Sequence, residues 1–335
     1  MMNRKLITEA PVVGPAELPR TIVRTASALL VKYNIVVVFI LMVIVSSMVS
    51  DVFMTPQNIS NLLVQVSGAS IASLGMLLVI LTGGIDLSVG SVFALSSVVL
   101  ALSTLRFPLA LALLIAILVS CASGSLVGYL VAGRGMAPFM ATLAFMTIDR
   151  GMAFILSKGS PISLPESASA LNTVFGTESL LGVPYPVLLM FVVFVYVLFT
   201  LRFSVFGRLI VGIGSNETAV LLSGIQVRRY KFLVYVLSAG LSALGGVIST
   251  ARTGVGSPVV GEGVELDAIA AVVIGGGSLM GGKGTALNTL LGALILGMIG
   301  NIMNLMNVPG YPQEVVKGVI IIVALLLQGI RRPES

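Results

Sequence analysis

The side chains that most often carry catalysis or hold metal ions are nearly absent from this chain. It contains no histidine, and its one cysteine, Cys121, lies within an apolar run. These facts exclude a Ser-His-Asp or Cys-His arrangement, a metal site built from histidine and cysteine, and an intrachain disulfide. We expect Cys121 to be a small residue that packs between helices. The sequence therefore predicts no catalytic residues, no metal site and no cofactor.

A glycine-rich segment at 277–285, GSLMGGKGT, comes close to the phosphate-binding pattern GxxxxGK[ST]. The residue after Lys283 is Gly284, so the hydroxyl that would bind magnesium is displaced by one position. Apolar, span-like runs flank the segment on both sides, where a phosphate-binding loop would follow a strand of a sheet. We expect a glycine-rich turn between two helices, with Lys283 at the cytoplasmic surface of a membrane.

Two pairs of charged residues lie inside apolar runs, where ionisable groups usually serve a function. Asp149 and Arg150 are sequence neighbours that point in different directions on a helix, so they neutralise each other poorly. They are the best argument for a transporter driven by an ion gradient. Glu314 and Lys317 lie three residues apart on one helix face, and we expect them to form a structural ion pair.

The elements that must position these residues are membrane-spanning helices. The chain is 57% hydrophobic and 10% charged, with a mean hydropathy of +1.10, whereas a soluble chain carries about 25% charged residues. Apolar runs of roughly 20 residues recur along it, and the short alternating segments of a transmembrane barrel do not. The sequence predicts an all-α, polytopic membrane protein. The net charge of +6 reflects membrane topology rather than nucleic-acid binding, because the basic residues lie in loops and tails.

The chain is predicted to have about ten transmembrane helices and both termini in the cytoplasm, which places most loop arginines and lysines inside. A cytoplasmic tail at 1–32 precedes one transmembrane domain at 33–330, and a short cytoplasmic tail follows at 331–335. The main rival has eight spans, with 87–105 or 266–280 only partly inserted. The predicted spans are 33–50, 61–81, 87–105, 109–132, 137–157, 184–201, 231–250, 266–280, 285–306 and 313–329.

A polar loop at 206–230 lies between two apolar spans. Its length and polarity indicate that another protein binds it. Asn216 or Ser215 is placed to cap a short helix at 217–223, and Gly224 is placed to end it. The alternative is an amphipathic segment that lies on the membrane surface. Two hairpins, 79–91 and 272–285, also share a pattern of apolar span, glycine pair, short polar turn and next span, which suggests an internal duplication.

Four segments together resemble the permease subunits of ribose-type ABC sugar importers, the inner-membrane components of binding-protein-dependent transport systems. The resemblance covers roughly residues 55–330. Its motifs are TGGIDLSVGS at 82–91, ATLAFMTIDRGMAFILSKGSPI at 141–162, GSNETAVLLSGI at 214–225 and VELDAIAAVVIGGGSLMGGKGT at 264–285. The resemblance implies a multi-pass protein of the cell inner membrane that forms a pore with a second permease subunit, identical or different. It also implies a periplasmic sugar-binding protein and a separate cytoplasmic ATPase as partners.

The resemblance implies that the loop at 206–230 is the coupling helix that docks on the ATPase. Its pattern departs from the family's at Ser215, where glycine is common, and at Leu221, where a basic residue is frequent. The candidate coupling residues are Gly207, Arg208, Gly214, Ser215, Asn216, Glu217, Ser223, Gly224 and Ile225. Charged residues at the outer face are candidates for docking the binding protein, with ordinary solvated loop charge as the alternative; they are Arg252, Glu262, Glu265 and Asp267.

Two sets of polar residues are candidates for the pore. Asp86, with Ser88, either caps the N-terminus of the third span or forms a gate whose carboxylate binds sugar hydroxyls. Asn301 and Asn304 form a stripe with Asn307 at intervals of three residues, leading to Gln313. This stripe either lines the pore or forms hydrogen bonds between helices.

The sequence thus predicts a permease subunit that imports a monosaccharide, ribose or a related sugar, by alternating access driven by a separate ATPase. The cargo and the membrane lipid are its other expected partners, and nucleic acid is not. An ion-coupled secondary transporter that uses Asp149 and Arg150 is the alternative. An intramembrane enzyme acting on lipid-linked sugars is a third possibility, but it needs an acidic pair beside basic phosphate contacts, and the sequence offers no such cluster.

Overall fold

The computed structural model describes residues 34–176 and 178–330, and these form a helical bundle. The two predicted tails, 1–32 and 331–335, lie outside the described residues. Each of the ten predicted spans contains a helix. These helices are α2 (Asn34–Val49), α3 (Pro56–Leu81), α4 (Val89–Thr104), α5 (Leu109–Gly128), α6 (Pro138–Ser157), α8 (Tyr185–Phe203), α11 (Val227–Thr253), α12 (Val264–Ile274), α13 (Ala286–Leu305) and α14 (Gly310–Ile330).

The helices differ in whether they can cross a membrane. Among the described residues, six are long and apolar enough: α3, α5 with the turn that continues it, α6, α8, α11 and α13. The helix α12 has 11 residues, a length of about 16 Å against a hydrocarbon core of about 30 Å. The predicted span 266–280 is therefore wrong in its length. The helix ends because three glycines follow Ile274, and Gly276 adopts a φ of 81°, which a right-handed helix does not accommodate.

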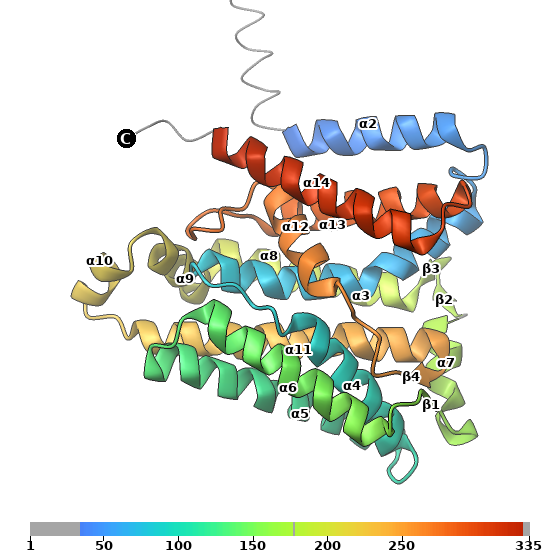
Figure 1. Cartoon of the computed structure of the whole chain (residues 1–335), viewed down its shortest axis with the longest axis horizontal. Helices are drawn as coiled ribbons and strands as arrows, with labels where there is room; N and C mark the ends of the chain where they lie inside the picture. Colours follow the sequence, from blue (N-terminus) through green and yellow to red (C-terminus); the bar gives the residue numbers. More distant parts are fainter. Residues whose placement is uncertain (1–33, 177, 331–335) are drawn as a thin grey trace, which may run out of the picture.

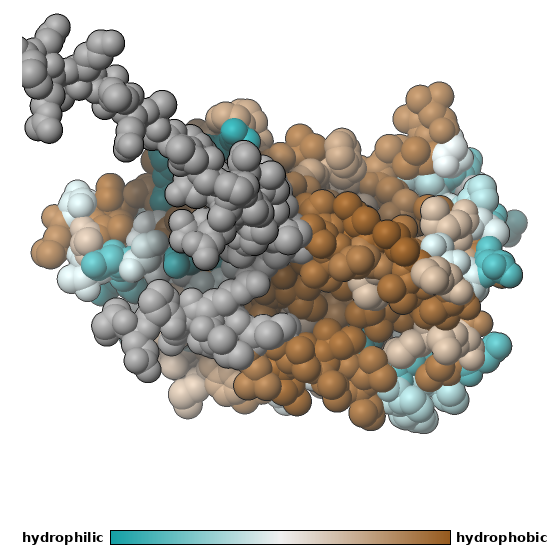
Figure 2. All heavy atoms as spheres, turned by 90° about the horizontal axis from the view of Figure 1, so that it is seen from above, coloured by the Kyte–Doolittle hydropathy of each residue, from teal (hydrophilic) through white to brown (hydrophobic). Residues whose placement is uncertain are grey.

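The bundle has two polar ends and an apolar middle. At one end α9 (Val205–Ser215) leads to α10 (Glu217–Leu222), which projects beyond the other helices (Figure 1). The opposite end carries α7 (Ser169–Gly176) and the small strands. Figure 2 shows hydrophobic residues in a belt across the middle, with hydrophilic residues at both ends. This distribution is that of a protein that spans a bilayer.

The elements between the spans were mostly absent from the prediction. A π-helical turn, η1 (Tyr129–Gly133), extends α5, and a 3₁₀ turn, η2 (Glu166–Ala168), precedes α7. Two antiparallel ribbons add a little β-structure to the predicted all-α fold. In one, β1 (Ile162–Ser163) pairs with β4 (Val255–Gly256), and in the other β2 (Ser179–Leu180) pairs with β3 (Val183–Pro184).

The centre of the bundle is the contact between α3 and α11. Most of α3 is buried, and α11 packs against α3, α4 and α5. Gly68 of α3 and Gly245 of α11 let the two backbones approach closely, since a Cβ atom on Gly245 would lie 2.8 Å from the Gly68 carbonyl oxygen. Small residues allow such contacts between helices in a membrane. The polar groups described next come from α11 and from the segment that follows α3.

Candidate functional site

Two breaks between helices meet beside the end of α9. One separates α3 from α4 at residues 82–88, and the other separates α12 from α13 at 275–285. The backbone N–H of Gly282 donates a hydrogen bond to the carbonyl of Leu81, with 3.0 Å between nitrogen and oxygen. Discontinuous helices often form the binding sites of transporters. The meeting of the two breaks is therefore our candidate site.

The predicted glycine-rich turn at 277–285 is confirmed. Gly281 and Gly282 both have positive φ, and the N–H of Ser278 donates to the carbonyl of Lys283 at 2.9 Å, which closes the turn. The helix α12 precedes the turn and α13 follows it. The turn therefore does not follow a strand, as a phosphate-binding loop does. The similar hairpin at 79–91 also has a helix on each side of a glycine-containing turn, so the two segments share local architecture as well as sequence pattern.

Asp86 lies in the first break and is 2% exposed. Its Oδ1 accepts hydrogen bonds from the backbone N–H and the hydroxyl of Ser88, at 3.0 and 2.5 Å. Its Oδ2 accepts a bond from the Ser238 hydroxyl of α11 at 2.8 Å. The expectation that Asp86 itself caps α4 needs correction, because Ser88 is the cap residue and α4 begins at Val89. Asp86 instead organises the turn before the helix and ties it to α11.

Two residues of this cluster were not identified from the sequence, Ser238 and Tyr235. Tyr235 is 1% exposed, and its hydroxyl has no hydrogen-bond partner among the described residues. The hydroxyl lies against Gly84, where a Cβ atom would come within 2.5 Å of it. Both residues come from α11, one turn apart, and face the break. A serine and a tyrosine in an apolar span carry no local signal of this role, because the break is far away in the sequence.

The second part of the site is the segment at 206–230. The predicted short helix is present as α10, and Asn216 is its cap, with Oδ1 accepting from the N–H of Ala219 at 2.9 Å. Gly224 follows with a φ of 80°. The helix α9, which precedes α10, was not predicted. Glu217 pairs with Lys231 at the start of α11, at 2.6 Å between Oε2 and Nζ.

The end of α9 touches both helix breaks. A Cβ atom on Gly214 would lie 1.9 Å from the Leu81 carbonyl oxygen and 2.5 Å from the Gly282 nitrogen. The next residue, Ser215, lies against Gly282, where a Cβ atom would come 2.4 Å from its hydroxyl. The end of α9 is therefore packed against the place where the two breaks join.

The remaining coupling candidates form local hydrogen bonds that stabilise the conformation of the segment at 206–230. At the beginning of α9, the N–H of Gly207 donates to the Ser204 hydroxyl at 2.9 Å, and Arg208 donates to the carbonyl of Phe203 at 3.3 Å. After α10, the Ser223 hydroxyl donates to the carbonyl of Ala219 at 2.9 Å. Ile225 accepts at its carbonyl from the N–H of Val227, also at 2.9 Å, which leads the chain into α11.

Asp149 and Arg150 point in different directions, as predicted. The Asp149 carboxylate accepts a hydrogen bond from the Ser123 hydroxyl of α5 at 2.7 Å. Arg150 donates to the carbonyls of Pro258 and Val260 at 2.7 and 2.8 Å, and to that of Gly90 at 3.2 Å. The guanidinium thus fastens the loop between β4 and α12 to the start of α4. Both side chains have structural partners.

The asparagine stripe divides into separate contacts. Asn301 and Asn58 of α3 exchange two amide hydrogen bonds, at 3.0 and 3.1 Å, and both residues are buried. Asn304 accepts from Gln313 at 2.8 Å. Asn307 lies beyond the end of α13 with a φ of 57°, so the stripe does not continue there. For Asn301, these contacts are the hydrogen bonds between helices that were the alternative to a pore lining.

The four docking candidates have different surroundings. Asp267 pairs with Lys317 at 3.4 Å, and Lys317 also forms the predicted pair with Glu314 at 3.1 Å. The Glu265 carboxylate packs against Gly90, where a Cβ atom would lie 2.0 Å from Oε2, and that oxygen has no partner among the described residues. Glu262 and Arg252 are exposed and take part in none of the ion pairs that the structure describes.

Comparisons with known proteins identify what this architecture is similar to. The family model described as "Branched-chain amino acid transport system / permease component" matches residues 58–325. A ribose import permease of Bacillus subtilis is 44% identical over 86% of this chain and 89% of its own length. That of Escherichia coli K12 is 42% identical over 90% and 95%. A D-allose transport system permease of the same strain is 37% identical over 86% and 89%. No solved structure matches the chain significantly.

Proposed function

Because the chain belongs to the permease family of ribose-type ABC importers, we propose that it is the pore-forming subunit of an ATP-driven monosaccharide importer. It is a multi-pass protein of the inner membrane. A separate cytoplasmic ATPase supplies the energy, a periplasmic binding protein delivers the sugar, and a second permease subunit completes the pore. The chain acts by alternating access and carries out no enzymatic step itself.

The proposed topology places α9 and α10 in the cytoplasm together with both termini. Basic residues support this orientation, because the segment from Arg202 to Lys231 contains five arginines and lysines and one acid, Glu217. All ten helices contribute to the membrane domain. The short helix α12 enters from the outer side and ends before Gly275, and the glycine-rich turn that follows reaches the end of α3 beside α9.

One observation carries the proposed mechanism, the contact of Gly214 with both breaks. In the proposed cycle, the ATPase binds the exposed tip of α10, where Leu222 is 82% exposed. Closure of the ATPase moves α10 and α9 together. Because backbone at Gly214 lies against backbone at Leu81 and Gly282, this movement shifts the two breaks, and with them α4 and α12. A packed contact of this kind switches between discrete arrangements rather than deforming continuously.

The proposed cargo is ribose or a related monosaccharide. The relatives named for ribose and for D-allose support a sugar, and the two ribose permeases have the higher identities. Asp86 and Ser88 are proposed gate residues, since a carboxylate and hydroxyl groups at a helix break suit a polyhydroxy solute. Selection among sugars rests mainly with the binding protein, because a pore that held its cargo tightly would release it slowly.

The test is recovery of the tagged chain from gently solubilised native membranes, with its co-purifying proteins identified. We expect an ATP-hydrolysing subunit in near-equal amount. Leu222→Glu should lose that subunit while the permease remains in the membrane, and the matched variant Leu222→Met should retain it. Recovery of the wild-type chain without an ATPase in several detergents would contradict the proposal. It would direct attention to ion-driven transport, which Asp149→Asn would then test.

A further inference from the structure

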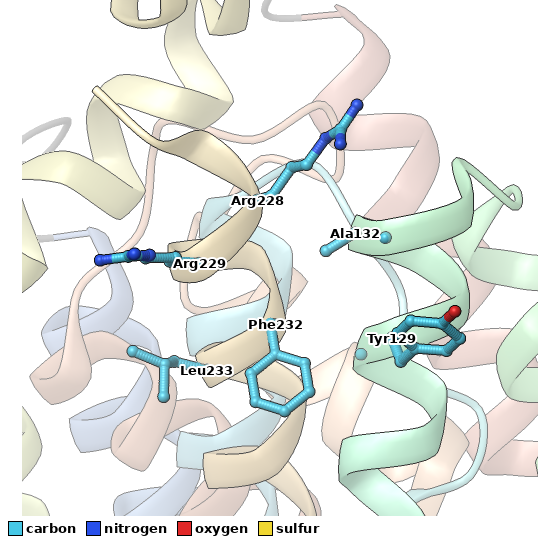
Figure 3. Close-up of a pocket in the computed structure, with 8 residues that line it drawn as sticks. Tyr129, Ala132, Arg228, Arg229, Phe232 and Leu233 are labelled. Atoms are coloured by element: carbon cyan, nitrogen blue, oxygen red, sulfur yellow. The ribbon is translucent and has the colours of Figure 1, made fainter. Parts of the chain in front are cut away.

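A pocket lies between the end of α5 and the start of α11, at the same end of the bundle as α9 and α10. Its volume is about 350 Å³, within the usual range for small-molecule sites. The walls come from η1 on one side and from the first two turns of α11 on the other (Figure 3). Its labelled lining residues are Tyr129, Ala132, Arg228, Arg229, Phe232 and Leu233. The function proposed above gives this pocket no role.

The pocket is apolar in its depth and basic at its rim. Figure 3 shows Phe232 and Ala132 facing the space between the two helices, with Arg228 extending from the first turn of α11 above Ala132. The apolar lining continues onto the surface, where Tyr129 is 48% and Leu233 42% exposed. The pocket therefore opens toward the hydrophobic belt on one side and toward the arginines on the other.

The two arginines at the rim are not engaged by acidic side chains. Arg228 and Arg229 are exposed, and neither takes part in an ion pair or a side-chain hydrogen bond that the described residues make. The one acid in the neighbouring sequence, Glu217, already pairs with Lys231. A third cation borders the pocket, because Arg134 donates a 2.9 Å hydrogen bond to the Tyr129 hydroxyl and stacks over its ring. The rim thus carries uncompensated positive charge.

We propose that this pocket binds an anionic phospholipid of the inner leaflet. The headgroup phosphate contacts Arg228, with Arg229 and Arg134 adding to the positive potential, and an acyl chain lies along Phe232 and Leu233. Basic pockets between transmembrane helices on the cytoplasmic side suit such headgroups, and arginine matches phosphate geometry well. A free phosphate ion would leave the apolar depth unused. A docked protein segment would have to enter the belt that faces lipid.

The chain contains no tryptophan, so the site can be probed with a single introduced indole. Phe232→Trp places the indole in the pocket of the full-length protein, reconstituted in phosphatidylcholine vesicles. Brominated phosphatidylglycerol should quench its fluorescence with an apparent affinity about fivefold higher than brominated phosphatidylcholine, the preference expected from one basic residue near an anionic lipid. The control Phe191→Trp, on the exposed face of α8, should be quenched equally by both lipids.

Removing the arginine charge at the rim tests whether the pocket binds an anionic lipid. In the Phe232→Trp background, Arg228→Gln should abolish the preference for phosphatidylglycerol, and Arg202→Gln, a cytoplasmic arginine outside the pocket, should leave it unchanged. Equal quenching by the two lipids at Phe232→Trp would overturn the proposal. Displacement of phosphatidylglycerol by inorganic phosphate would reassign the pocket to a free anion. If neither brominated lipid quenched the introduced indole, a protein surface would have to cover the pocket. That result would also overturn the lipid assignment.

Discussion

Gly282 and Leu81 are joined by a backbone hydrogen bond of 3.0 Å, which connects the break after α12 to the end of α3. The Cα atom of Gly214 occupies the space beside this bond. Three backbone segments therefore meet at one point, two from the interrupted helices and one from the segment that leads to α10. The arrangement leaves little room for side-chain atoms, and it makes the contact sensitive to the addition of a single methyl group.

We expect Gly214→Ala to impair both stability and transport. Its methyl group would overlap backbone atoms of Leu81 and Gly282, which cannot move aside as a side chain could. Overpacking of this kind costs about 1–3 kcal/mol. Gly212→Ala is the matched control in the same helix, since its Cβ atom would meet only a Val220 methyl group at 3.4 Å. Sugar uptake in cells and thermal unfolding in detergent measure the two effects. Normal uptake by Gly214→Ala would show that the contact does not transmit movement.

The tie between Asp86 and Ser238 predicts coupled effects on stability. Asp86→Ala leaves the donors of Ser88 and Ser238 without their acceptor. Each buried unsatisfied donor should lower the free energy of unfolding by about 1–3 kcal/mol. Ser238→Ala removes one bond to a carboxylate, and its effect should be smaller. The double variant should lose less stability than the sum of the losses in the two single variants, by about 0.5–3 kcal/mol. Additive losses in thermal unfolding would mean that the two residues do not interact.

The positions of the spans could be predicted from the sequence because they depend on local hydropathy. Each predicted span contains a helix, and the ends differ by a few residues. The exception is 266–280, where hydropathy continues past Ile274 but the backbone does not, because glycines with positive φ interrupt the helix. Hydropathy measures the preference of side chains for lipid and does not measure backbone conformation. The interruption is visible only when the glycines are considered as helix ends.

The local features of the candidate site were also predictable, but its assembly was not. Asn216 and Gly224 are a cap and a terminator by residue type, and the structure confirms α10 between them. The contact of Gly214 with Leu81, by contrast, joins segments that are distant in sequence. The partners of Asp86 on α11 are of the same kind. Such contacts depend on how helices pack, and serine, tyrosine and glycine are common at every packed interface in a membrane protein.

The reciprocal amide bonds of Asn58 and Asn301 provide a test of whether Asn301 belongs to the pore. Asn301→Ala leaves the Asn58 side chain with one remaining bond, to the carbonyl of Phe53. We expect a loss of about 1–2 kcal/mol in stability and an unchanged KM for sugar uptake. Replacing both asparagines with leucine should restore part of the stability, since no buried side-chain amide is then unpaired and only the Phe53 carbonyl loses a donor. A raised KM in a stable Asn301 variant would favour the pore lining instead.

Gly224 ends α10 with a φ of 80°, and this geometry determines how substitutions there must be interpreted. No atom lies within 4 Å of the place where a Cβ atom would stand, so the cost of a side chain is conformational rather than steric. Asparagine tolerates this region better than alanine, and valine tolerates it least. We therefore expect uptake to fall in the order glycine, asparagine, alanine, valine. Equal uptake by all four would show that the shape of this turn is unimportant for coupling.

The outer acidic residues need separate tests, because Glu265 and Glu262 have different surroundings. Charge reversal at Glu265 would place a lysine against Gly90, and the resulting loss of stability would obscure any effect on docking. Glu262 is exposed, so Glu262→Lys should leave the fold intact. If its charge attracts the binding protein, uptake should fall at limiting sugar and low salt and recover when the binding protein is in excess, since exposed charges mainly affect association rates. Glu262→Gln should give an intermediate result. Unchanged uptake by Glu262→Lys at limiting sugar would remove this residue from the docking surface.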